Sequence, residues 1–278
     1  MAPTFAQAAE TKEEYSQSGN PLEAALLLQP TISLPAALGL FKDSREKARL
    51  NFSPAFNLDF VKRLLGLKEG GRLSRSTGRR LNGLQGHIAE IIEPRICYTV
   101  QKIAANEHGA VTLDSGPVLR STKLAHTLKK AHSVVALAAT VGEAVDEEIE
   151  RMMDSGKMAD AYVVDALGSG AVEQLVESFQ NDVGDKLKTY GQDVGLRFSP
   201  GYCDWPVFEQ KKLFSLLDGG SIGISLAETS LMHPRKSISA VFGVYDEEAA
   251  PCRENHNPCR LCAKKDCLAR RTARQTPT

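Results

Sequence analysis

The sequence predicts an α+β fold in which helices and strands are interspersed. Segments with the apolar spacing of helices alternate with short strand-like segments, and no regular strand–helix–strand repeat appears. No internal repeat of solenoid length is present either. At 278 residues the chain can bury a sizeable core in one large domain with appendages.

Three regions are predicted along the chain. Residues 1–54 form an N-terminal appendage, in which Pro30 and Pro35 interrupt short helical patterns because proline removes a backbone donor. Residues 55–246 form the main domain, and residues 247–278 form a cysteine-rich tail.

The elements of the main domain follow from its apolar periodicity. Helices are predicted where apolar residues recur every three to four positions, at 58–67, 81–93, 145–156, 158–190 and 208–220. Residues 70–80 are predicted to be a basic, glycine-bearing connection. Strands are predicted where apolar and polar residues alternate or an apolar run is short, at 95–103, 109–113, 132–142, 221–226 and 237–244.

The longest helical pattern contains the run Gly168-Ser169-Gly170-Ala171. Glycine costs about 1 kcal/mol relative to alanine inside a helix. Close packing of another element or a ligand against that face would account for the glycines, and a helix break at Gly168 is the alternative.

Charge and composition narrow the classes of partner. The chain carries 34 basic and 34 acidic residues, so its net charge is zero. A neutral chain gives no indication of nucleic acid or a membrane surface as a partner. The first residues lack the pattern of a secretory signal, and no apolar run is long enough to cross a bilayer. Four of the six cysteines cluster near the end of the chain, which favours metal chemistry in a reducing cytoplasm.

The segment RFSPGYCDWP, from Arg197 to Pro206, combines a cation, two prolines, a glycine and an aromatic ring. The Arg197 guanidinium suits a carboxylate, and Gly201 allows a close backbone approach. Tyr202 offers a flat face with a polar tip. Such a loop fits a small zwitterion with an aromatic ring, whereas an ordinary Pro-Gly connection is the alternative.

This loop resembles the AdoMet-binding motif in the activation domain of cobalamin-dependent methionine synthase. The motif has an Arg, three residues, Gly-Tyr, and a Pro four residues after the Tyr, which here are Arg197, Gly201, Tyr202 and Pro206. Ser199 occupies the position of the motif's small residue.

Other segments extend the resemblance to roughly residues 55–245. Pro234, Ser237 and Ser239 fit the family's Pro-x-x-Ser-x-Ser segment, and Glu173 stands where the family has a helix glutamate near the AdoMet site. The segment that starts at Glu93 is similar to the family's early Asn/Lys-Pro-Arg strand.

The resemblance implies a fold of mixed helices around a twisted antiparallel sheet. It also implies reductive activation of a corrinoid by AdoMet-dependent remethylation coupled to one-electron reduction. The implied cofactor-binding residues are Glu173, Arg197, Ser199, Gly201 and Tyr202, whereas no catalytic residue is assigned. The family's cobalamin-ligating Asp-x-His-x-x-Gly pattern is absent from the sequence. The cobalamin is therefore expected on a partner corrinoid-binding protein, with a flavodoxin- or ferredoxin-like electron donor.

The family's Ala-Cys-Pro ending reads Cys203-Asp204-Trp205-Pro206 here, a form similar to stand-alone relatives of the domain. Two further functions therefore stand beside reductive activation. One is a non-catalytic clamp for a corrinoid protein, with a structural zinc in the tail. The other is a subunit of a split cobalamin-dependent methionine synthase.

The tail places Cys252, Cys259, Cys262 and Cys267 within sixteen residues. A Cys-x2-Cys pair lets two thiolates bind one ion, and the outer cysteines can complete a four-sulfur set. An iron–sulfur cluster, a zinc ion and metal-free thiols all stand as interpretations, and His256 is either a ligand or a solvated residue. The basic tail either docks an acidic redox partner or is a solvated terminus.

Four residues outside the tail have two interpretations each. Cys97 is predicted in the core rather than as a ligand, and Cys203 is either packed or a reactive thiol facing cobalt. Asp204 either caps the loop or contacts a substrate amino group. Trp205 either anchors the packing or stacks on a corrin or adenine ring.

Overall fold

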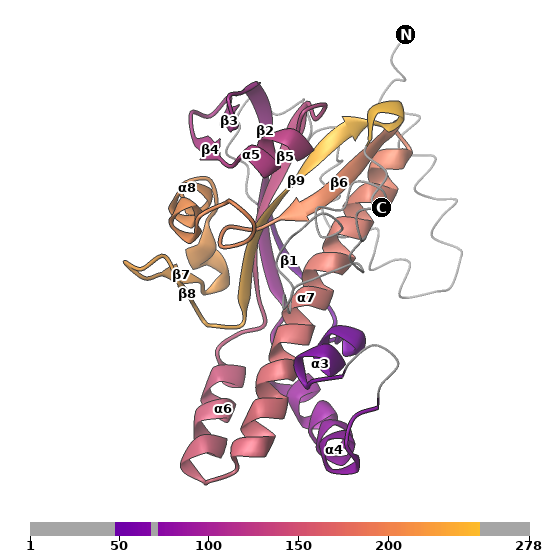
Figure 1. Ribbon diagram of the computed structural model, residues 1–278, viewed down its shortest axis with the longest axis vertical. Helices are drawn as coiled ribbons and strands as arrows, with labels where there is room; N and C mark the ends of the chain where they lie inside the picture. The colour runs from indigo at the N-terminus through magenta and orange to yellow at the C-terminus, as the bar shows by residue number, and fades with distance from the viewer. Residues whose placement is uncertain (1–47, 68–71, 251–278) are drawn as a thin grey trace, which may run out of the picture. The chain divides into compact units, whose positions relative to one another are not determined.

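The computed structural model describes residues 48–67 and 72–250, in which helices and antiparallel strands are interspersed along the chain (Figure 1). The side chains of residues 48–51 are not described. The N-terminal appendage up to residue 47 and the tail from residue 251 also lie outside the described residues.

Seven strands form one sheet, and every pairing in it is antiparallel. The order is β4-β3-β2-β5-β9-β6, and β1 pairs with β2 off this path. The strands are β1 (Ala48–Asn51), β2 (Arg95–Glu107), β3 (Ala110–Leu113), β4 (Val118–Arg120), β5 (Ser133–Thr140), β6 (Gln192–Phe198) and β9 (Ser237–Asp246). β1 lies in the segment predicted as appendage, so that part of it joins the sheet.

The strand predicted at 221–226 is mostly absent. Asp218 caps a 3-10 helix, η3 (Gly219–Ile222), by accepting a hydrogen bond from Ser221 N, and Gly223 ends it at a φ of 79°. Only β7 (Ser225–Leu226) is extended, and it pairs with β8 (Met232–His233) in a separate two-stranded ribbon. A local side-chain cap thus outweighs the alternating pattern.

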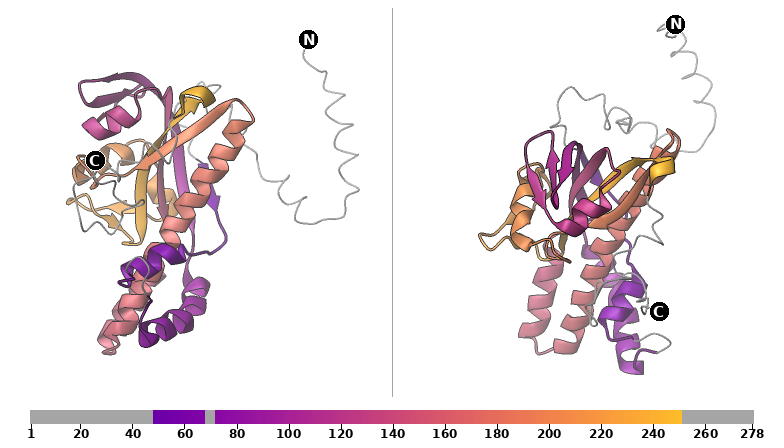
Figure 2. Two further views of the ribbon diagram at one scale, coloured as in Figure 1. Left: turned by 45° about the vertical axis from the view of Figure 1, so that its right-hand side comes forward. Right: turned by 45° about the horizontal axis from the view of Figure 1, so that its top comes forward.

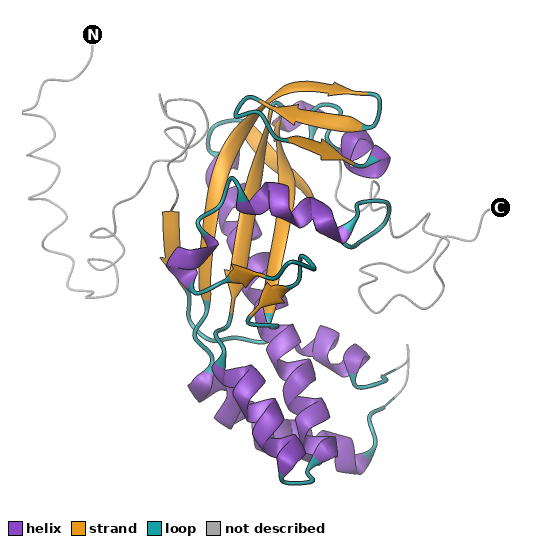
Figure 3. Ribbon diagram, turned by 90° about the vertical axis from the view of Figure 1, so that its left-hand side faces the viewer, coloured by secondary structure: helices purple, strands orange, loops and turns teal. Residues whose placement is uncertain are grey.

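The helices divide into a group of four that pack together and a set of separate short helices. Four helices pack on one another: α3 (Leu58–Leu64), α4 (Arg75–Ile91), α6 (Ala144–Asp154) and α7 (Met158–Lys188), as the turned views of Figure 2 show. The short helices are α5 (Thr122–Thr127), η2 (Val207–Glu209), α8 (Gln210–Phe214) and η4 (Glu247–Ala249) (Figure 3). The predicted connection at 70–80 is helical from Arg75, because the Ser74 hydroxyl caps Thr77 N at 3.1 Å.

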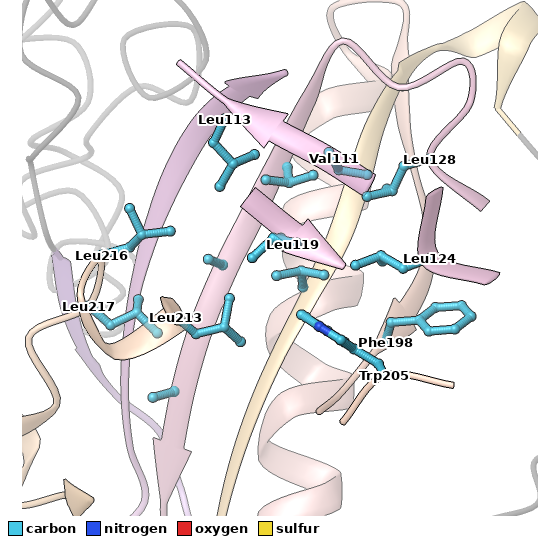
Figure 4. Packing of buried hydrophobic residues seen from close by; sticks show 14 of the residues in the cluster. Val111, Leu113, Leu119, Leu124, Leu128, Phe198, Trp205, Leu213, Leu216 and Leu217 are labelled. Atoms are coloured by element: carbon cyan, nitrogen blue, oxygen red, sulfur yellow. The ribbon is translucent and has the colours of Figure 1, made fainter. Parts of the chain in front are cut away.

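The two faces of the sheet bury different partners. On one face, Tyr98 and Phe242 pack against Phe179 of α7, with ring centroids 5.0 and 6.3 Å from the Phe179 ring. The opposite face holds the hydrophobic cluster drawn in Figure 4, in which Cys97 and Val241 of the sheet meet side chains from α5, α8, η3 and the β3–β4 hairpin. Cys97 is 1% exposed, which agrees with its predicted place in the core.

Helix α7 runs without a break through its glycines, so the predicted alternative of a break at Gly168 is wrong. A Cβ on Gly168 would lie 2.7 Å from Val145 Cγ1 and 3.0 Å from Lys236 Cγ. A Cβ on Gly170 would lie 2.2 Å from Val61 Cγ2, and the Gly170 carbonyl accepts a hydrogen bond from Asn57 N. The glycines therefore let α6, α3 and the segment before β9 contact α7 closely.

We expect Gly170→Ala to lower the free energy of unfolding by about 1–3 kcal/mol, because the added methyl overpacks the α3–α7 contact. Gly83→Ala in α4 is the matched control, since nothing lies within 4 Å of its Cβ position. The control should stabilise the protein by up to about 1 kcal/mol through helix propensity. Urea unfolding of both variants measures the difference, and equal effects would contradict the packing argument.

Candidate functional site

Strand β6 and helix α7 bring together the two charged residues that the sequence placed at the site. Arg197 Nη2 donates a hydrogen bond to Glu173 Oε2. The Arg197 side chain is 4% exposed and the Glu173 side chain is 24% exposed. The guanidinium therefore lies inside the β6–α7 contact, and the carboxylate is the member of the pair that solvent reaches.

Glu173 belongs to a polar row on α7. Asp165, Ser169 and Glu173 are spaced four residues apart, which places them on one face of the helix. Lys236 Nζ donates to Asp165 Oδ1 at 2.6 Å and to Ser169 Oγ at 3.0 Å. The row thus binds one cation from β6 and another from the segment that leads into β9.

The loop after β6 is closed by its own backbone. Gly201 N donates to Trp205 O at 2.8 Å, Trp205 N donates to Tyr202 O at 3.0 Å, and Tyr202 N donates to Ser199 O at 3.3 Å. Gly201 has a φ of 87° and Cys203 a φ of 56°, so the tight turn uses the left-handed region twice. This closure holds Ser199, Gly201 and Tyr202 directly beyond Arg197.

The loop divides into an anchor and an exposed tip. Trp205 is 1% exposed and packs in the cluster on the sheet face opposite α7 (Figure 4), so it is a packing anchor and is not placed to stack on a ligand ring. Tyr202 is 50% exposed, and Cys203 is exposed as well. The prediction of a packed Cys203 thiol is therefore wrong, because the turn directs this residue outward.

Asp204 fixes the other side of the loop to α5. Its carboxylate accepts hydrogen bonds from Ser121 Oγ at 2.6 Å and from Lys123 N at 3.1 Å. Partial burial alone would raise the pKa of Asp204, but these hydrogen bonds outweigh it and lower that pKa. Asp204 thus binds the start of α5 and does not cap its own loop by an Asx turn, so the capping interpretation is wrong in its partner.

The Pro-x-x-Ser-x-Ser segment is connected to α8 and, through it, to the β7–β8 turn. Pro234 is buried, and its carbonyl accepts a hydrogen bond from Ser237 Oγ at 2.7 Å. Ser239 Oγ donates to Gln210 Oε1 at 2.9 Å, and Gln210 Nε2 donates to Ser230 O at 2.7 Å. Ser239 is 2% exposed, so it ties β9 to α8 rather than facing a ligand.

Sequence reasoning missed several residues that hold the site together. Gln210 and Lys236 bind across elements far apart in the sequence, and the buried Glu209 accepts hydrogen bonds from Arg120 N at 2.9 Å and Lys212 Nζ at 2.6 Å. Only weak sequence features could have pointed to these residues. Lys236 lies inside the Pro234–Ser239 motif, and Glu209 and Gln210 lie in a predicted amphipathic helix.

The predicted metal ligands Cys252, Cys259, Cys262 and Cys267 lie outside the described residues, and their role stays a prediction. Across residues 48–67 and 72–250, no three His, Cys, Asp or Glu side chains are grouped so that they could hold a metal ion. No helix in this part of the chain is long and apolar enough to cross a membrane.

These features define a class of protein: an α+β domain in which one long helix covers an antiparallel sheet and an Arg-Gly-Tyr-Pro loop leaves the edge strand. Residues 124–249 match the family described as vitamin B12-dependent methionine synthase, activation domain. This match confirms the resemblance and includes the loop, Glu173 and the Pro-x-x-Ser-x-Ser segment.

A solved structure supports the same fold. The chain is similar to a protein described as the MetH reactivation domain bound to AdoHcy, with a TM-score of 0.56 and 16% sequence identity. The similarity covers 74% of this chain and 80% of that one. The predicted α+β fold of helices around an antiparallel sheet is thereby confirmed. No curated protein matches the sequence.

We expect Asp204→Asn to destabilise the protein near neutral pH and to lose this effect in acid. The folded-state pKa of Asp204 is lowered, so its ionised form stabilises the fold above the unfolded-state value of about 3.9. That contribution disappears as the pH falls through the folded-state pKa. Unfolding free energies of the wild type and the variant from pH 7 to pH 2 measure it, and a constant difference would contradict it.

Proposed function

We propose that this chain reactivates an oxidised corrinoid on a partner protein by AdoMet-dependent remethylation coupled to one-electron reduction. The observation that carries the proposal is the ion pair between Arg197 and Glu173 at the start of the Arg-x3-Gly-Tyr-x3-Pro loop. The activation-domain match over residues 124–249 and the AdoHcy-bound reactivation domain of the same fold support it.

The charges at the site fit the amino-acid end of AdoMet. That end carries a carboxylate and an ammonium group, and Arg197 and Glu173 offer one complementary charge each. Binding the zwitterion would exchange one ion pair for two and leave the net charge of the site unchanged. The guanidinium then keeps a charged partner at every stage, which matters because an unpaired buried charge is costly.

The reaction joins two events at the partner's cobalt. The oxidised Co(II) corrinoid gains one electron from an external donor, and the resulting Co(I) attacks the methyl carbon of AdoMet. The methyl–sulfur bond breaks with its electron pair staying on sulfur, which releases AdoHcy. The task of this chain is to orient the two reactants rather than to supply an acid or a base.

The loop residues have separate tasks in this proposal. Arg197 holds the carboxylate, Glu173 the ammonium or sulfonium charge, and the backbone at Ser199 and Gly201 lines the ligand. Tyr202 is half exposed at the tip of the loop, which suits contact with a large ring brought by a partner.

A non-catalytic clamp for a corrinoid protein is the second candidate function, and exposed apolar side chains favour it. Val207 and Phe208 follow the loop and are 39% and 61% exposed, and Leu231 in the β7–β8 turn is 62% exposed. Exposed apolar groups of this kind occur at protein-binding surfaces. A clamp would need these residues but not AdoMet.

We expect calorimetry on the full chain to show AdoHcy binding that Arg197→Met weakens at least about tenfold, since a hydrogen bond to a charged group contributes about 1.5–3 kcal/mol. Arg151→Met is the matched control, because Arg151 also pairs with a glutamate, Glu148, but within α6. An unchanged affinity in the control is part of the expected result. Absence of AdoHcy binding by the wild type would favour the clamp.

We also propose that the four tail cysteines hold an iron–sulfur cluster that passes the electron. The compact spacing of the four cysteines supports this proposal, and iron–sulfur clusters reach the low reduction potentials that cobalt reduction demands. Protein purified without oxygen should contain iron and sulfide and show a broad visible charge-transfer absorption, which Cys259→Ser should diminish. Stoichiometric zinc without iron would refute the cluster and indicate a structural site.

A further inference from the structure

Strand β6 carries a β-bulge directly before Arg197. Val194 pairs with Val244 of β9, whereas Arg197 pairs with Phe242, so three steps along β6 match two steps along β9. One extra residue of β6 therefore lies at Gly195-Leu196. Bulges redirect side chains, and they occur often beside functional sites.

The extra residue decides which face of the sheet Arg197 occupies. Without it, Arg197 would pair with Val241, whose side chain lies in the hydrophobic cluster on the face opposite α7. With it, Arg197 shares the face of Phe242, which packs against α7. A shift of one residue moves every later side chain to the other face. The bulge is thus the reason that Arg197 meets Glu173 and that Phe198 enters the cluster.

Two buried side chains hold the bulge from opposite sides. Gln180 of α7 is 8% exposed and donates from Nε2 to Gly195 O at 2.6 Å. On the other face, a Cβ on Gly195 would lie 2.7 Å from Cε2 of Tyr245, whose hydroxyl donates to Thr127 O at 2.7 Å. The Tyr245 ring therefore lies against Gly195, and Gln180 satisfies the carbonyl that the bulge takes out of the ladder.

Gln180 and Glu173 are seven residues apart on α7, which is two helical turns and places both on the same face. The same helix face thus binds the bulge through Gln180 and the guanidinium through Glu173. A displacement of one contact along the strand would displace the other.

We propose that Gln180 is a positioning residue for Arg197: it fixes the Gly195 bulge and thereby the face on which the guanidinium receives a carboxylate ligand. This inference rests on the proposed function for the role of Arg197 in AdoMet binding. No sequence pattern points to Gln180, and its effect on a ligand passes entirely through the backbone of β6.

The test compares two ligands that differ in the amino-acid end. Gln180→Met should weaken AdoHcy binding about tenfold but leave the binding of 5′-methylthioadenosine, which lacks a carboxylate, unchanged. Gly195→Ala disturbs the same bulge from the Tyr245 side and should give the same selective loss. Combined with Arg197→Met, Gln180→Met should add no further loss, since both act on one interaction.

Gln174→Met is the matched control, because Gln174 lies on the same helix but its amide donates to Ser178 Oγ within α7. Its ligand affinities should equal those of the wild type. An equal loss for both ligands in Gln180→Met, or additivity with Arg197→Met, would show a merely structural role and overturn the inference.

A second readout needs no ligand and separates this inference from the proposed function. The Arg197 Nε–H signal in a ¹H–¹⁵N spectrum is identified by its loss in Arg197→Met. It should shift or vanish in Gln180→Met and stay in place in Gln174→Met. If the wild type binds no AdoHcy, the proposed function fails, and the Arg197 Nε–H signal alone tests the positioning role of Gln180. An unmoved signal in Gln180→Met refutes the positioning role.

Discussion

The site depends on keeping a charged partner beside a guanidinium that the fold buries between β6 and α7. A buried charge without such a partner is strongly destabilising, so Glu173 has to reach Arg197 from the helix. This requirement explains the bulge in β6, which turns the guanidinium toward the helix. The glycines of α7 serve separate contacts, with α3, α6 and the segment before β9.

The two faces of the sheet hold different parts of the site. The α7 face holds the charged pair, whereas the opposite face holds Trp205, which ties the end of the loop into the hydrophobic cluster. Asp204 adds a polar tie to α5. Because the loop starts on one face and is anchored on the other, the backbone of its tip at Tyr202 is fixed. A fixed tip loses little conformational entropy when a ligand or partner binds.

Much of this arrangement could be predicted from the sequence, and the missing parts have a common cause. Periodicity located α7 and the strands β2, β3, β5 and β9, because an apolar pattern reports burial directly. It did not predict β1, β4, β6 or β8. The family motif located Arg197, Gly201 and Tyr202. Because β6 itself was not predicted as a strand, its bulge could not be predicted either. Gln180 was equally hidden, because its partner is a backbone carbonyl that offers no signal in the sequence.

The fixed contacts of the loop also narrow the chemistry at the site. Both carboxylate oxygens of Asp204 accept hydrogen bonds at the start of α5, and Ser239 is buried against α8. Neither side chain is therefore placed to meet a ligand. Asp165 already binds Lys236, which leaves Glu173 as the acid that faces the guanidinium. A ligand that enters there must satisfy a cation and an anion together. Under the proposed function, that condition would favour a zwitterionic amino-acid end over a purely anionic or purely cationic group, and the Arg197–Glu173 pair would be the selective element of the site.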